Sequence, residues 1–66
     1  MNAKYLITSI IIDKSGTRQD YVLQFTKEMD LEVVRKVAKG IRIGILERPE
    51  VESVKTYVAE VIETHE

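Results

Sequence analysis

The residue types that most often carry catalysis are few in this chain, and local structure explains each of them. His65 is the only histidine and lies one residue from the C-terminus, where ends fray and a general base lacks an oriented partner. The hydroxyl candidates are the three serines, Ser9, Ser15 and Ser53. A predicted turn accounts for Ser15, strand alternation for Ser9, and the first turn of a predicted helix for Ser53. The sequence therefore identifies no catalytic residue.

The spacing of the acidic residues and glycines supports neither metal nor phosphate chemistry. The chain contains no cysteine, so a cysteine-based zinc site is impossible. Asp13 fits a turn and Asp30 fits a helix cap, and no Asp/Glu spacing resembles a calcium loop. The Gly40-x-x-x-Gly44 pattern lacks the lysine–serine pair of a phosphate loop, and its glycines would permit close approach of another element. We therefore expect a non-enzymatic protein with no cofactor and no metal.

One basic cluster rises above the background of a chain whose net charge is −1. Its members are Arg35, Lys36, Lys39, Arg42 and Arg48, of which the first four are the candidate contact residues. On a continuous helix, three of them share a face at three- and four-residue spacing, with Lys36 beside them. This face predicts contact with a phosphate backbone or an acidic protein surface. The alternative is that a neighbouring acidic helix neutralises the cluster, or that it is a plain solvated face.

The elements that position these residues begin with a predicted β-hairpin over residues 4–26. The Asp-Lys-Ser-Gly sequence at residues 13–16 joins two runs rich in β-branched residues. It suits a type I turn followed by Gly16 at positive φ. The resulting register places Ser9 opposite Tyr21. The predicted core face of the hairpin consists of Tyr5, Ile7, Ile11, Tyr21, Leu23 and Phe25.

The opposite face of the hairpin is more apolar than a solvated face should be. Its apolar members are Leu6, Ile10, Ile12 and Val22. A two-stranded ribbon is marginal in water, so the first strand is expected to have a second neighbour, within the chain or on another copy. Because a chain this short has a small core and no disulfide, this face predicts self-association. The alternative is a strand with a generous apolar content.

Two helices are predicted to cover the hairpin. The first begins after Asp30, a good N-cap, and apolar residues at three- and four-residue spacing carry it to about Glu47. Alternatively, Gly40 ends this helix and residues 41–46 form a third strand.

A second amphipathic helix is predicted after Pro49, because valines recur at three- and four-residue spacing with glutamates opposite them. These valines are Val51, Val54, Val58 and Val61. The predicted fold is thus α+β, an N-terminal antiparallel β-hairpin covered by two helices (ββαα), in a single small domain over residues 1–66. The alternative is ββαβα with residues 41–46 as a third strand.

The composition and the two surfaces favour a binding protein. No apolar run approaches the ~20 residues of a membrane span, so we expect no membrane association and a cytoplasmic location. We expect a small stand-alone binding or regulatory protein that acts through a protein–protein interface, as a homodimer. The alternatives are a nucleic-acid-binding protein that uses the basic helix face, and a structural subunit of a larger assembly. The identity of the partner does not follow from the sequence.

Overall fold

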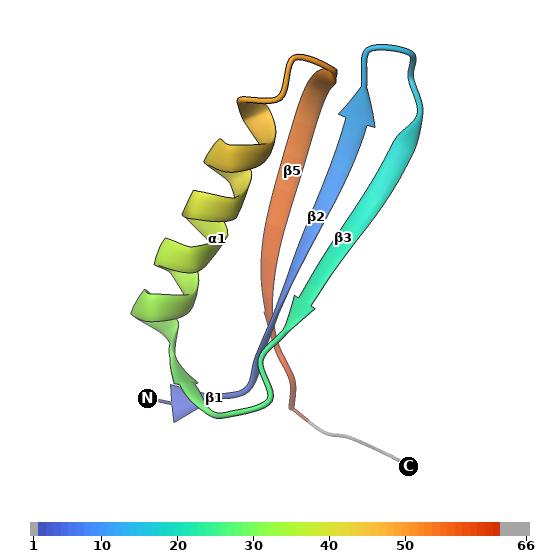
Figure 1. Ribbon diagram of the computed structural model, residues 1–66. Coiled ribbons are helices and arrows are strands. Elements are labelled where there is room, and N and C mark those ends of the chain that lie inside the picture. The colour runs from blue at the N-terminus through green and yellow to red at the C-terminus, as the bar shows by residue number, and fades with distance from the viewer. Residues whose placement is uncertain (1, 63–66) are drawn as a thin grey trace.

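In the computed structural model, which describes residues 2–62, a long helix lies on one face of an antiparallel sheet (Figure 1). In chain order the elements are β1 (Asn2–Ala3), β2 (Tyr5–Asp13), β3 (Arg18–Gln24), β4 (Met29–Asp30), α1 (Leu31–Leu46) and β5 (Val51–Glu60). The main sheet has the strand order β3-β2-β5, and β1 pairs with β4 in a separate two-stranded sheet. His65 lies outside the described residues.

The predicted hairpin is confirmed, because β2 and β3 pair antiparallel in the predicted register. Gly16 has a φ of 86°, and the N–H of Asp13 donates to the carbonyl of Thr17 at 3.0 Å. Asp13 Oδ1 accepts hydrogen bonds from the N–H groups of Ser15 (2.9 Å) and Thr17 (2.8 Å), and from Ser15 Oγ (2.6 Å). The turn is therefore held by a side chain as well as by the backbone.

The long first helix is also confirmed, and residues 41–46 are helical rather than a third strand. Asp30 caps α1, since its Oδ1 accepts a hydrogen bond from the N–H of Glu32 at 3.0 Å. Glu32 adds a carboxylate in the first turn, where the helix dipole favours negative charge. At the other end, the N–H of Glu47 still donates to the carbonyl of Ile43 at 3.2 Å.

The predicted second helix is wrong, and with it the ββαα fold, because Val51–Glu60 is the strand β5. The ββαβα alternative is wrong as well. β5 pairs antiparallel with β2, so it is the second neighbour that the first strand was expected to have, supplied from within the chain. The β-branched residues Val54, Thr56 and Val58 alternate along β5 beneath α1, an arrangement that favours a strand. The described residues thus form an α+β fold with one helix and five strands.

The core lies between α1 and the covered face of the sheet. Its buried side chains are Tyr5, Ile7, Ser9, Val34, Ala38, Ile45 and Val54. Leu23 and Phe25 of the predicted core face pack against this core, and Ile11 is half-buried. Tyr21 is an exception with 47% exposure, because α1 packs over β5 and β2 and leaves β3 beyond its cover (Figure 1).

Candidate binding surfaces

The sheet has a covered face and an open face. β2 side chains alternate between the two, so the fully buried Ile7 and Ser9 point toward α1 and their neighbours point away. Val22 on β3 and Tyr57 on β5 both lie opposite Thr8, and they are 56% and 52% exposed. We call this surface the open sheet face, and its apolar members are Leu6, Ile10, Ile12, Val22, Tyr57 and Ala59.

Charges on the open sheet face lie on either side of its apolar centre. Ile10 on β2 pairs with Asp20 of β3 and with Lys55 of β5, so these two opposite charges flank it. Arg18 Nε lies 3.0 Å from Asp20 Oδ1, and both side chains are about half exposed. The Ile10 row of the open sheet face therefore has an apolar centre with a negative charge on one side and a positive charge on the other.

The four residues predicted for self-association all lie on the open sheet face, together with Tyr57. Sequence reasoning missed Tyr57 because it assigned this segment to a helix. The alternation of Lys55 and Tyr57 with Thr56 and Val58 was the signal available for placing it on a strand face.

The basic residues predicted as a contact surface are all exposed on α1. We call them the basic flank: Arg35, Lys36, Lys39 and Arg42. The one ion pair that residues 2–62 provide for them joins Arg35 Nη1 to Glu32 Oε1 at 3.8 Å, between exposed side chains. The prediction that a neighbouring acidic helix neutralises the basic flank is wrong, because the segment predicted as that helix is the strand β5.

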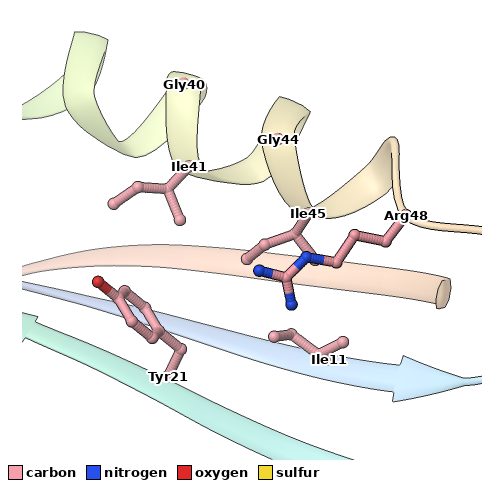
Figure 2. A pocket seen from close by; sticks show the side chains of 7 residues that line it. All are labelled: Ile11, Tyr21, Gly40, Ile41, Gly44, Ile45 and Arg48. Carbon is pink, nitrogen blue, oxygen red and sulfur yellow. The ribbon is translucent and has the colours of Figure 1, made fainter. Parts of the chain in front are cut away.

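A groove of about 340 Å³ lies between α1 and β3 (Figure 2). Its lining residues are Ile11, Tyr21, Gly40, Ile41, Gly44, Ile45 and Arg48. In Figure 2 the side chains of Ile41 and Ile45 point from α1 toward the sheet, and the Arg48 guanidinium lies between α1 and Ile11. A Cβ atom built on Gly40 or Gly44 would meet no atom within 4 Å. The glycines therefore border open space here, instead of the close contact that the sequence suggested.

Most of the basic flank lies away from the groove. At 3.6 residues per turn, Arg35, Lys39 and Arg42 fall within a narrow sector of α1. Gly40 and Gly44, which face β3 across the groove, fall more than a quarter turn away from that sector. The fourth member, Lys36, lies one turn before Gly40 and therefore on nearly the same side of α1 as the groove. The buried stripe of α1 separates the Ile41 wall of the groove from the other three basic residues.

No protein-family model, curated protein or solved structure matches the chain. Among the described residues, no helix has both the length and the apolar content needed to cross a bilayer. The same residues bring together no group of three or more His, Cys, Asp and Glu side chains that could hold a metal ion. The candidate sites are therefore the open sheet face, the groove and the basic flank.

Proposed function

We propose that this chain is a non-catalytic binding protein that acts as a homodimer, with the open sheet faces of two protomers packed together. The observation that carries the proposal is that α1 covers one face of the sheet and leaves the open sheet face uncovered. An apolar sheet face is stable when a layer of helices or a second sheet buries it. In this chain α1 buries one face of the sheet, and the other face has no such layer in residues 2–62. A second copy would complete a four-layer arrangement with the two helices outermost.

Charge complementarity favours one symmetry for this dimer. With a two-fold axis parallel to β2, β3 of one protomer lies over β5 of its partner. Asp20 of each protomer then faces the partner's Lys55, which gives two symmetry-related ion pairs. Ile10 faces the partner's Ile10 between these two pairs. With an in-plane axis perpendicular to the strands, β3 instead lies over β3 of the partner, so Asp20 does not meet the partner's Lys55. We therefore propose the parallel axis.

The size of the face sets the expected strength of association. Three strands ~4.8 Å apart and seven residues at ~3.4 Å each give a face of roughly 340 Å² in projection. Accessible area exceeds projected area, but a face of this size is still small beside the ~800 Å² of accessible surface that each partner contributes to a standard interface. We therefore expect a dissociation constant in the micromolar range rather than the nanomolar range.

Sedimentation equilibrium between about 1 and 200 µM tests the proposal, because this range brackets a micromolar dissociation constant. Ile10→Lys should shift the protein toward monomer, since it would bury a charge at the centre of the interface. The matched control is Ile43→Lys, which changes an exposed isoleucine of α1 far from the open sheet face. A parent that stays monomeric throughout this range, or an Ile10→Lys variant that dimerises like the parent, would rule out this dimer.

A charge exchange tests the symmetry separately. Asp20→Lys should weaken the dimer by placing like charges together, and adding Lys55→Asp in the same chain should restore it. If the double variant is as weak as the single one, then Asp20 and the partner's Lys55 do not face each other, and the parallel axis is wrong.

A second candidate function is nucleic-acid binding through the basic flank. It is favoured by the exposure of these four side chains and by the 3.8 Å separation of the one ion pair found for them in residues 2–62. Three or four phosphate contacts per protomer predict a log–log salt slope of about −3. A structural role in a larger assembly and a cytoplasmic location stay predictions from the sequence.

Retention of duplex DNA and of structured RNA at low salt tests this second candidate. Arg35→Glu combined with Lys39→Glu should abolish retention and leave the midpoint of urea unfolding nearly unchanged, because exposed ion pairs contribute little to stability. Lys14→Glu combined with Lys27→Glu is the control, since it makes the same charge change at exposed positions outside α1. If neither nucleic acid is retained by the parent protein, the candidate is wrong.

A further inference from the structure

We propose that the groove between α1 and β3 binds a small amphipathic carboxylate, with one aliphatic or aromatic part and one anionic end. This site lies on the helix side of the sheet, so it is independent of the proposed dimer interface. The inference rests on how the groove arises, on the chemistry of its lining and on the position of its cation.

The groove arises because one helix does not cover three strands. α1 packs over β5 and β2, and the helix side of β3 stays accessible, as the 47% exposure of Tyr21 shows. Gly40 and Gly44 remove two side chains from the side of α1 that borders the groove, and nothing occupies the space that a Cβ would take. Glycine is the poorest helix former after proline, so two interior glycines weaken α1 while they widen this groove.

The lining combines apolar walls with few polar groups, which is typical of small-molecule sites. Ile11, Ile41 and Ile45 supply the apolar surface, and the volume of about 340 Å³ is near the lower end of the usual range for such sites. In Figure 2 the Tyr21 hydroxyl and the Arg48 guanidinium lie toward opposite ends of the groove. A ligand whose anionic end lies at Arg48 and whose apolar part packs against the three isoleucines, with Tyr21 bordering its far end, fits this lining.

Arg48 is the group that selects an anion. Within residues 2–62 its guanidinium forms no ion pair within 4 Å, and its planar fork is suited to a carboxylate. Arg48 also borders a smaller hollow of about 130 Å³, which Asp13 and Glu50 line. Asp13 is already engaged by its own turn. The negative charge on that side directs the ligand carboxylate to the α1 side of Arg48, with the apolar part extending toward Gly40.

Nuclear magnetic resonance titration with two matched probes tests the site. The probes are 4-phenylbutyrate and its neutral counterpart 4-phenylbutan-1-ol. Phenylbutyrate should shift the amide signals of Gly40 and Gly44 with a dissociation constant in the millimolar range, as expected for a ligand of about twelve non-hydrogen atoms. The alcohol should bind about fivefold more weakly, because it lacks the ion pair with Arg48.

Three variants separate the contributions to binding. Gly44→Leu should fill the groove and abolish the shifts at Gly40, whereas the fold should persist because leucine is a better helix former and the space is empty. Arg48→Gln should lower the affinity for phenylbutyrate to that for the alcohol. Arg42→Gln on the basic flank is the matched control and should bind like the parent. Ile10→Lys should also bind like the parent, whether or not the parent is a dimer.

Four outcomes would overturn the proposal. The first is no shift at Gly40 or Gly44 with phenylbutyrate up to about 10 mM, well above the expected dissociation constant. The second is equal affinity for the two probes, and the third is unchanged binding by Gly44→Leu. The fourth is a shift of the same amides with protein concentration alone, which would identify a second copy of the chain as the occupant.

Discussion

Ser9 Oγ and Thr56 Oγ1 lie 3.0 Å apart, and this hydrogen bond joins β2 to β5 beneath α1. Ser9 is fully buried, whereas Thr56 is half-buried. Among the described residues, no buried side-chain nitrogen or oxygen lacks a hydrogen-bond partner. The pair therefore allows a hydroxyl group to lie in an apolar core without an uncompensated loss of hydration.

We predict that Thr56→Val lowers the free energy of unfolding by about 1–3 kcal/mol, because it leaves the Ser9 hydroxyl buried without its partner. Combining it with Ser9→Ala should recover much of the loss, since no unpaired hydroxyl then remains. Urea unfolding of the two single variants and the double variant measures the coupling. Purely additive losses would show that the two hydroxyls act independently.

Gly16→Val should lower the free energy of unfolding by about 1 kcal/mol or more, because a β-branched residue resists a φ of 86°. Lys14→Val is the control, since it places valine in the same turn, where no residue other than glycine has a positive φ. The midpoints of urea unfolding give the comparison. Equal stability of the two variants would contradict the left-handed conformation at Gly16.

Gly44→Ala should raise the free energy of unfolding by up to about 1 kcal/mol, because the residue is helical and its added methyl group meets no atom within 4 Å. Gly40→Ala should behave similarly for the same reasons. Thermal unfolding monitored by circular dichroism measures both. A destabilised Gly44→Ala variant would mean that another element packs closely against this side of α1.

The pKa of Asp13 is lowered from its ordinary value of 3.8, first by the hydrogen bond from the Ser15 hydroxyl and then by that from the Thr17 backbone. A depressed carboxyl pKa adds stability above the pKa of the unfolded chain, and this is lost as the pH falls through the folded value. The stability advantage of the parent over Asp13→Asn should therefore be present at neutral pH and shrink below about pH 4. Urea unfolding from pH 7 to pH 2 measures this difference, and an advantage independent of pH would contradict the prediction.

The parts of the fold that depend on local chemistry were predictable from the sequence. The turn follows from Asp13 and Gly16, whose roles involve residues at most four positions away. The start of α1 follows from the Asp30 cap, which acts within two residues. These short-range hydrogen bonds form in almost any tertiary context, so local sequence is enough to place them.

The strand β5 was not predictable in the same way. Val51, Val54 and Val58 are spaced like the apolar stripe of a helix, and the long-range pairing with β2 decided otherwise. The alternation of Val54, Thr56 and Val58, all β-branched, was the opposing signal. The apolar excess on the first strand was a further indication, because it pointed to a second neighbour.

The candidate sites also differ in whether local sequence or tertiary packing determines them. The open sheet face was predictable in part, because the alternation of Leu6, Ile10 and Ile12 along one strand places them on one side. The groove was not predictable, because it depends on where α1 lies relative to β3. That placement is a tertiary property, and Gly40 and Gly44 indicate only that side chains are missing from part of the helix.

The strand order β3-β2-β5 also bears on how truncated chains behave. β2 and β3 are joined by a short turn, but the other edge of β2 has its partner only when β5 is present. Without β5, a strand with apolar side chains on both faces exposes unpaired backbone groups, a template for pairing between chains. Chains that are truncated before Val51 should therefore aggregate more readily than the full chain.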